Sequence, residues 1–200
     1  PYLKDIKVTQ TIGHGEIYDD ISAAVAENNI DLVVMGSHGA SGFKEMFIGS
    51  NTEKVVRTSK IPVLVIKNEH KDFTINDFVF ASDFSNECKK SFEKAQKFAK
   101  EVGAKIHLLY VNTPAGFKTS PQAKAIMEKF LTGTKAENYT LNVYNDTSVE
   151  KGILNFAKES GAQLVGMSTH GRKGISHFFH GSISEDLVNH AKMPVITFKI

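Results

Sequence analysis

The chain has 200 residues, a length that fits one or two domains and a sizeable buried core. Hydrophobic residues make up 41% and charged residues 23%, which argues against long disordered tracts, collagen-like repeats and coiled coils. The 24 basic residues nearly balance the 22 acidic ones, with a formal charge of +2, so we expect no nucleic-acid partner.

The sequence shows no sign of a membrane or of an oxidising compartment. No stretch approaches the roughly 18 uninterrupted apolar residues of a membrane span, and the N-terminal residues lack the basic-then-apolar plan of a signal peptide. The single cysteine, Cys88, excludes an internal disulfide and a cysteine-rich zinc site. We therefore expect a cytoplasmic protein with no membrane partner.

Residues 1–67 alternate between strand and helix patterns. The stretch at 6–11 and the apolar runs at 32–35 and 63–66 predict three strands. An apolar face from Ile17 to Val25 predicts a helix between the first two strands, and a second helix is expected to begin at Ser50, before the third strand. The polar stretch at 68–72 follows, and we place a linker between two domains there.

The same alternation continues through residues 73–200 with five strands and four helices. Ser85 is expected to open the first helix and Gly103 to close it. Ser120 and Pro121 have the pattern of an N-cap followed by proline at the first helical position. This alternation predicts an α/β fold with a doubly wound parallel sheet. The predicted strands are 78–81, 106–111, 139–144, 164–167 and 194–198, and the remaining helices lie near Val149 and from Ser182.

Two parts of the chain match without a gap at an offset of 132 residues. Met35-Gly36-Ser37-His38-Gly39 matches Met167-Ser168-Thr169-His170-Gly171. The same offset relates Pro62-Val63 to Pro194-Val195, near the end of each copy. Residues 1–67 therefore match 133–199, while 68–132 have no earlier counterpart. We interpret residues 73–200 as one complete domain and residues 1–67 as the later half of another copy.

Each copy contains a glycine-bearing turn after a buried strand, then a loop, then Gly-Ser at a helix start. Glycines let backbone amides approach a ligand, and a helix N-terminus favours phosphate. Ser-x-x-Glu from Ser50 and from Ser182 has the spacing of a capping box. The alternative is that the glycines serve ordinary turns and the serines only cap. The candidate residues are Gly36, His38, Gly39, Gly49, Ser50, Asn51 and Thr52 in the first copy and Gly171, Gly181 and Ser182 in the second.

Two further candidates follow neighbouring strands of the complete unit. Asp83 comes after the strand at 78–81 and Val111 ends the next one, at the edge where doubly wound sheets bind ligands. An aspartate there can accept hydrogen bonds from ribose hydroxyls, and the backbone at Val111 can pair with an adenine edge. The alternative for Asp83 is an Asx turn or an N-cap leading into the helix at Ser85.

These residues resemble the universal stress protein family. The patterns Gly36-x2-Gly39-x9-Gly49-Ser50 and Ser168-x2-Gly171-x9-Gly181-Ser182 are similar to its nucleotide loop, and Asp83-Phe84-Ser85 is similar to the end of its first strand. The resemblance covers nearly the whole chain. It implies a tandem protein with an N-terminally truncated first domain and five parallel strands in the order 3-2-1-4-5. It also implies ATP or AMP as ligand, with or without Mg²⁺, and dimerisation through the last strands.

The resemblance also implies roles for residues. Asp83 resembles the ribose and adenine-side aspartate, Val111 the adenine-contacting backbone, and Met167 a pocket wall. Ser168 departs from the pattern, because it stands where the first glycine is expected; a need for bare backbone or positive φ there would weaken or abolish binding. The first copy keeps every glycine but lacks the strand with an aspartate. The second-copy residues so implied are Ala81, Asp83, Val111, Met167, Ser168, Gly171, Gly181, Ser182, Ile183 and Ser184.

No paired carboxylates, Ser/His/Asp arrangement or metal cluster can be recognised, so the pattern favours binding over turnover. The first hypothesis is a regulatory module of the stress response in which ATP or AMP shifts conformation or partner choice. The second is a nucleotide-free interaction or scaffold module of the same fold. The third is a slow ATPase in which Ser182 or Ser184 positions or accepts a phosphoryl group.

The closing strands at 63–66 and 195–198 are expected to be sheet edges with unpaired amides. Pairing one with the other would give a pseudo-dimer within the chain. Pairing with another chain would give a homodimer.

Overall fold

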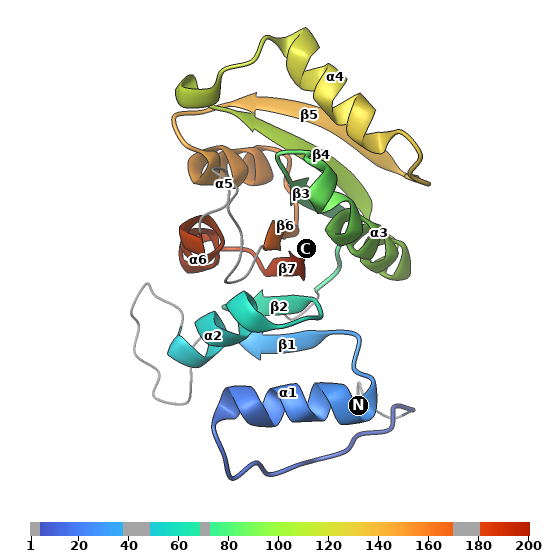
Figure 1. The fold of residues 1–200 in the computed structure, drawn as a ribbon, viewed down its shortest axis with the longest axis vertical. Coiled ribbons are helices and arrows are strands. Elements are labelled where there is room, and N and C mark those ends of the chain that lie inside the picture. The colour runs from blue at the N-terminus through green and yellow to red at the C-terminus, as the bar shows by residue number, and fades with distance from the viewer. Residues whose placement is uncertain (1–4, 38–48, 69–72, 170–180) are drawn as a thin grey trace.

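The computed structural model describes residues 5–37, 49–68, 73–169 and 181–200. In these residues one sheet runs through the molecule in the strand order β1-β2-β7-β6-β3-β4-β5 (Figure 1). Its strands are β1 Val33–Gly36, β2 Val63–Ile66, β3 Asp77–Ala81, β4 Lys105–Asn112, β5 Tyr139–Asn145, β6 Leu164–Thr169 and β7 Val195–Lys199.

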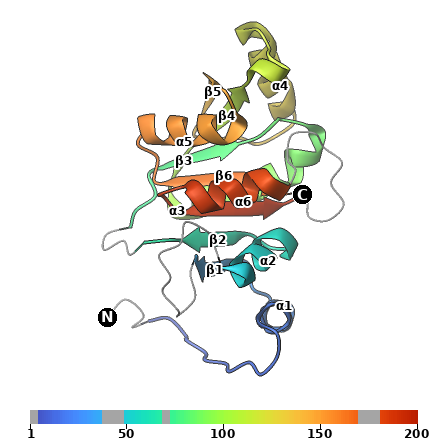
Figure 2. The same cartoon turned by 90° about the vertical axis from the view of Figure 1, so that its left-hand side faces the viewer.

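Helices cover both faces of this sheet. α5 and α6 lie on one face together with α2, whereas α3 and α4 lie on the other (Figures 1 and 2). Each face therefore has its own apolar core. The helices are α1 Ile17–Asn28, α2 Ser50–Thr58, α3 Lys89–Val102, α4 Ser120–Leu131, α5 Val149–Glu159 and α6 Gly181–His190, with short 3₁₀ turns η1 Asn86–Cys88 and η2 Pro114–Gly116.

The strands from β3 to β7 are parallel to their neighbours within this group. Counted from β3 as the first, they lie in the order 3-2-1-4-5, so β3 is central with β4 and β6 beside it. β3 is apolar on both faces, with Phe78 and Phe80 in the core under α3 and Val79 and Ala81 in the core under α5 and α6. The parallel sheet with helices on both faces that the sequence predicts is confirmed.

β2 joins the first part of the chain to this sheet by running antiparallel to β7. Leu64 pairs with Ile196, its own counterpart in the repeat, at the centre of the ladder. On either side the pairs are Val63↔Thr197 and Val65↔Val195, so each residue pairs with the repeat counterpart of the other pair's residue. The two closing strands thus lie about a local two-fold axis. Of the two pairings expected for these edges, the structure shows the one within the chain, and the sheet therefore extends beyond the five strands of one domain.

Two lysines repeat this two-fold relation. Lys67, after β2, donates a hydrogen bond to the Asn189 carbonyl near the end of α6. Lys199, at the end of β7, donates to the Arg57 carbonyl near the end of α2, at 3.3 Å. The lysines lie one repeat apart, and so do the carbonyls. Because a cation stabilises the negative end of a helix, each copy caps a helix of the other.

Residues 6–11 do not form the strand that their apolar pattern predicts. Ile6, Val8 and Ile12 are 60%, 56% and 83% exposed. The corresponding strand of the second copy, β5, pairs with β4, and no described strand of the first copy takes the place of β4. A lone strand has no hydrogen-bond partner, so this prediction was wrong: the described residues of the first copy provide no neighbouring strand.

Two helix caps also differ from prediction. Gly49, rather than Ser50, is the N-cap of α2, and the predicted Ser50–Glu53 capping box is replaced by an ion pair from Glu53 to Arg57 at 3.4 Å. Thr119, rather than Ser120, caps α4 in a box with Gln122. The predicted close of α3 is confirmed, since Gly103 has a φ of 72°. The side chains at the start of α6 that would form the second box lie outside the described residues.

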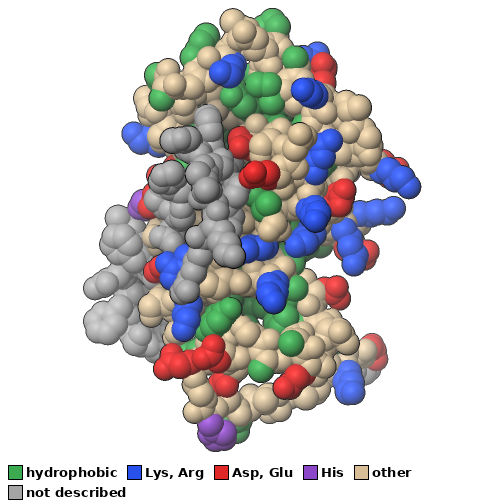
Figure 3. All heavy atoms as spheres, in the orientation of Figure 1, with side chains coloured by type: hydrophobic (Ala, Val, Ile, Leu, Met, Phe, Trp, Pro, Cys, Tyr) green, Lys and Arg blue, Asp and Glu red, His purple; other side chains and the backbone are tan. Residues whose placement is uncertain are grey.

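α3 packs one face on the sheet and turns the other to solvent. Phe92 and Ala95 are fully buried against the sheet. Figure 3 shows Lys and Arg side chains gathered over this side of the molecule, with acidic side chains among them. Such a mixed surface is that of an ordinary solvated helix face. The exposed lysines of α3 are Lys90, Lys94, Lys97 and Lys100.

Gly166 of β6 lies where a side chain has no room, because a Cβ would come within 2.5 Å of the buried Phe78 ring. We predict that Gly166→Ala lowers the free energy of unfolding by about 2 kcal/mol, measured by urea denaturation. Phe78→Leu makes room, so the two changes together should cost less than their sum. Strictly additive losses would show that the ring is not the obstacle.

Candidate functional site

The carboxyl ends of β3, β4 and β6 meet at one edge because these strands are parallel neighbours. A shallow cleft lies there, formed by the ends of β3 and β4 and by the start of α5. The fold thus brings together three of the candidates from the sequence: Ala81, Asp83 and Val111. The full lining is Ala81, Ser82, Asp83, Leu109, Tyr110, Val111 and Val149.

Asp83 lies partly buried in the turn between β3 and η1. Its Oδ1 accepts a hydrogen bond from the Ser85 amide at 2.9 Å and another from the Cys88 thiol at 3.3 Å. The first is the Asx turn that the sequence left open as an alternative. Both of these bonds reach Oδ1, and within the described residues no hydrogen bond is made by Oδ2. The turn and a ligand contact are therefore compatible.

The backbone of Val111 faces past the end of β3. Hydrogen bonds along β4 alternate between its two neighbours, so the Asn112 carbonyl accepts from Asp146 beside β5 and the Leu109 carbonyl accepts from Ser82 beside β3. Val111 therefore points to the β3 side, where that strand has ended. An amide and a carbonyl placed in this way can pair with the edge of a planar base.

An apolar core lies behind the cleft, and Met167 belongs to that core without lining the cleft itself. Ala81, Val111 and Met167 belong to one buried core, with Met167 fully buried. Gly152 of α5 lies against Val111, and a Cβ at Gly152 would overlap Val111 Cγ1. The glycine thus lets α5 pack against the end of β4 and fixes the position of Val111.

Ser168 points away from the cleft. Neighbouring residues of a strand face opposite sides of a sheet, and Met167 faces the core under α5 and α6. Ser168 is fully buried on the α3 side, with its Oγ 2.6 Å from the Ser91 Oγ. Its φ is not positive either. The sequence raised two ways in which Ser168 could weaken binding: a need for positive φ and a side chain that obstructs the ligand. The structure shows neither of them in the described cleft.

The second loop lies only partly within the described residues. Gly171 is outside them. α6 begins at Gly181, with Ser182 next in its first turn. Ile183 and Ser184 follow and are partly buried. The helix start expected to face phosphates is thus present, and nothing is described of the loop before it.

The first copy shows how such a helix start meets its strand. The Gly49 amide donates to the Ser37 carbonyl at 2.8 Å, and the buried Thr52 hydroxyl donates to the Gly36 carbonyl at 3.0 Å. Strand end and helix start are thereby locked together. The other first-copy candidates are Ser50 and Asn51, which are exposed in α2, and His38 and Gly39, which lie outside the described residues.

The two copies differ at the strand ends where Asp83 and Val111 lie in the second copy. β1 pairs with β2, and no described strand of the first copy occupies the place that β3 has beside β6. The first copy therefore has no described residue where Asp83 and Val111 lie in the second.

Sequence reasoning missed Asn112, which is buried at the end of β4. Its side-chain amide donates to the Lys118 carbonyl at 3.0 Å and to Asn145 Oδ1 at 2.8 Å. Its Oδ1 accepts from the Lys118 amide at 2.8 Å. These bonds fix the loop that follows β4 beside the cleft. The available signal was a polar side chain at the buried end of a strand, which needs such partners.

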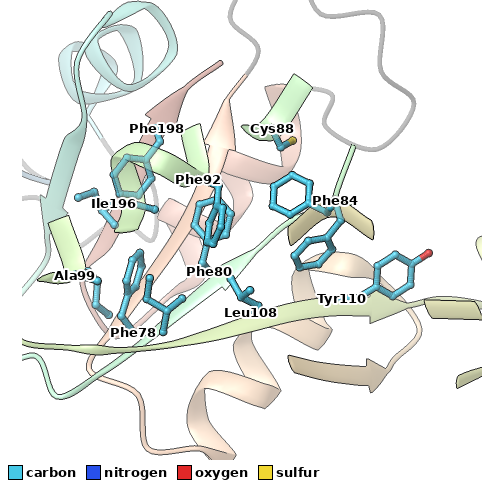
Figure 4. Packing of buried hydrophobic residues seen from close by; sticks show 14 of the residues in the cluster. Phe78, Phe80, Phe84, Cys88, Phe92, Ala99, Leu108, Tyr110, Ile196 and Phe198 are labelled. Atoms are coloured by element: carbon cyan, nitrogen blue, oxygen red, sulfur yellow. The ribbon is translucent and has the colours of Figure 1, made fainter. Parts of the chain in front are cut away.

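Phe84 was also missed. Its φ of 57° lies in the left-handed region, which is unusual for a bulky residue. The buried ring stacks beside Tyr110 at a centroid distance of 6.4 Å and meets Phe130 edge-on at 5.3 Å. Figure 4 shows Phe84 and Tyr110 together at one end of this aromatic cluster. The packing holds the strained turn that directs the chain from Asp83 into η1.

Burial raises the pKa of the Cys88 thiol, and the charge of Asp83 raises it further. Burial, and then Asp83, likewise raise the pKa of the Tyr110 hydroxyl. Both groups therefore stay protonated at neutral pH. The Cys88 thiol thus remains a hydrogen-bond donor to Asp83.

In the described part of the chain no group of three or more His, Cys, Asp or Glu side chains could hold a metal ion. Nor do those residues form a helix long and apolar enough to cross a membrane.

The strain at Phe84 predicts an inverted order of stability. Either truncation removes the ring packing and should cost about 3 kcal/mol. Glycine adopts positive φ without strain, so we predict that Phe84→Gly is about 1 kcal/mol more stable than Phe84→Ala, against the usual order. Urea denaturation of the two variants measures this. A more stable alanine variant would show that the turn carries no strain.

A model of the universal stress protein family matches residues 2–67 and again residues 75–199. Universal stress protein Slr1230 of Synechocystis is 24% identical over 178 residues, which cover 86% of this chain and 59% of that protein. Universal stress protein MJ0577 of Methanocaldococcus jannaschii is 37% identical over 70 residues, which cover 34% of this chain and 43% of that protein. The chain thus spans about three-fifths of Slr1230.

A solved structure has the same arrangement over most of the chain. The crystal structure of a universal stress protein from Archaeoglobus fulgidus matches with a TM-score of 0.67 at 26% identity, covering 91% of this chain and 64% of that one. The family model accounts for both copies of the repeat and for nearly every residue. The chain belongs to the universal stress protein family.

Proposed function

We propose that this chain binds one adenine nucleotide, ATP or AMP, at the carboxyl edge of β3, β4 and β6, as a regulatory module of the stress response. One observation carries the proposal: a carboxylate oxygen of Asp83 and the backbone groups of Val111 are available beside the same cleft. Switch-point edges of doubly wound sheets are where such ligands bind.

Each part of the nucleotide has a counterpart in this chain. The Asp83 carboxylate would accept hydrogen bonds from the ribose, and the backbone of Val111 would pair with the adenine edge. Ala81 lines the cleft beneath the proposed place of the base, and Met167 lies in the apolar core behind it. The phosphates would lie at the N-terminus of α6, whose amides and dipole favour anions. Gly171, Gly181, Ser182, Ile183 and Ser184 are the residues we assign to that end.

The residues at this edge fit a nucleotide better than a metal of the protein's own. The described cleft offers a single carboxylate, Asp83, and its Oδ1 is already engaged. Mg²⁺ prefers several oxygen ligands and is commonly held through substrate phosphates. We therefore assign any Mg²⁺ to the phosphates of the bound nucleotide.

The first copy, residues 1–67, would then act as a structural partner. Its helix start and strand end are locked by Gly49 and Thr52. Its described residues supply no adenine or ribose side, so we place the single site in residues 73–200. The closing strands β2 and β7 already pair with each other, which makes the chain a pseudo-dimer. We place this role in the cytoplasm, where Cys88 would stay reduced.

Asp83→Ala tests the site directly. We predict that it weakens binding of ATP or AMP at least tenfold in a calorimetric titration, because a charged acceptor of ribose hydroxyls is lost. The matched control is Asp77→Ala at the opposite end of the same strand, where the carboxylate contacts His107 at 2.7 Å. That control should bind as the unchanged chain does. Equal affinities of the Asp83 variant and the unchanged chain would refute the assigned ribose contact.

The unchanged chain separates the three functional hypotheses. Binding with a dissociation constant below about 1 mM, or release of ATP or AMP on denaturing the purified protein, supports the nucleotide module. No binding supports the scaffold alternative. Steady release of ADP from ATP that survives stringent purification supports the ATPase.

A further inference from the structure

We propose that Ser91 is a positioning residue of the nucleotide site: its hydroxyl ties Ser168, at the end of β6, to the turn that holds Asp83. The inference rests on the proposed nucleotide site. It adds a residue that touches no nucleotide and explains how a serine is accommodated in place of the family's glycine.

The hydrogen bonds have a defined direction. Ser91 Oγ donates to the Cys88 carbonyl at 2.8 Å. A serine hydroxyl carries one proton, so in the 2.6 Å contact between the two hydroxyls Ser168 is the donor and Ser91 the acceptor. The proton of Ser168 is thus committed to α3 and is turned away from the ligand side of β6.

Burial makes this bond consequential. Ser91 and Ser168 are both 0% exposed, between β6 and α3. Phe80, Phe92 and Phe198 form an aromatic cluster on this face of the sheet (Figure 4), and Phe198 is the β7 residue paired with Ser168. A hydroxyl in such a place without a partner is strongly disfavoured.

The same short segment also holds the aspartate. Cys88, one helical turn before Ser91, donates its thiol proton to Asp83 Oδ1 at 3.3 Å. The Ser85 amide donates to the same oxygen at 2.9 Å. Residues 85–91 therefore contact both strand ends of the proposed site, Asp83 after β3 and Ser168 in β6. Movement of either end is resisted by one rigid piece of chain.

Loss of Ser91 should therefore disturb the site through Ser168. In Ser91→Ala the Ser168 hydroxyl loses its oxygen acceptor and keeps only the Cys88 thiol sulfur, which is a weak acceptor. It must therefore turn or shift the end of β6, directly before the loop that leads to α6. In Ser168→Ala the Ser91 hydroxyl keeps the Cys88 carbonyl as its acceptor, so that change should be mild. The double variant leaves no orphaned hydroxyl and should be close to the unchanged chain.

The test is a double-mutant cycle of Ser91→Ala and Ser168→Ala, with ATP affinity by calorimetry and the midpoint of thermal unfolding as two readouts. We expect Ser91→Ala to weaken ATP binding about fivefold and to lower the midpoint by roughly 4 °C. Adding Ser168→Ala should restore the affinity to within twofold. Ser160→Ala is the control. Ser160 lies between α5 and β6, and its hydroxyl donates to the Phe156 carbonyl at the end of α5. It should lower the midpoint without changing affinity.

Unchanged affinity in Ser91→Ala, or a loss of affinity that Ser168→Ala does not restore, would overturn the proposal. A chain that binds no ATP or AMP at all would instead refute the proposed function. The double-mutant cycle of thermal unfolding midpoints needs no nucleotide and therefore tests the Ser91–Ser168 hydrogen bond by itself. Additive shifts of the midpoint would refute that bond. A shift in the double variant smaller than the sum of the two single shifts would support it.

Discussion

The antiparallel pairing of β2 with β7 makes two unequal copies of one repeat into a single sheet. Strands as few as those of residues 5–68 do not bury a core alone. The first copy is stabilised by the β2–β7 ladder, whose central pair is Leu64 and Ile196, and by lysine contacts that each copy makes to the other. Lys67 caps α6 and Lys199 caps α2, so each copy stabilises a helix of the other.

In the proposed function, this arrangement also decides where the nucleotide would bind. In the second copy β3 lies between β4 and β6, and its end brings Asp83 beside Val111 in one cleft. In the first copy β1 has β2 on one side and no described strand on the other. Gly49 and Thr52 make their hydrogen bonds at the start of α2. The described residues of the first copy, however, include no counterpart of the part that would bind a base and a ribose.

The repeat and the alternation of apolar runs are enough to predict the parallel sheet and the places of Asp83 and Val111, because buried parallel strands have near-continuous apolar sequences. Residues 6–11, in which Ile6 and Val8 alternate with polar residues, also predict a strand and form none, since pairing depends on a neighbour that local pattern does not reveal. Ser168 is a similar case. Whether a serine can replace a glycine depends on the face it occupies and on Ser91, 77 residues earlier in the chain. Phe84 left no local signal either, because its φ is set by packing against Tyr110 and Phe130.

The number of adenine nucleotides bound per chain at saturation tests this account most directly. Equilibrium dialysis of the purified chain against radiolabelled ATP, with the protein concentration fixed by amino-acid analysis, gives that number. One nucleotide per chain is expected, because among the described residues only those of 73–200 bring an aspartate and a free strand backbone to the same edge. Two nucleotides per chain would show that the first copy has a complete site, and none would show that the edge of β3, β4 and β6 is not a nucleotide site.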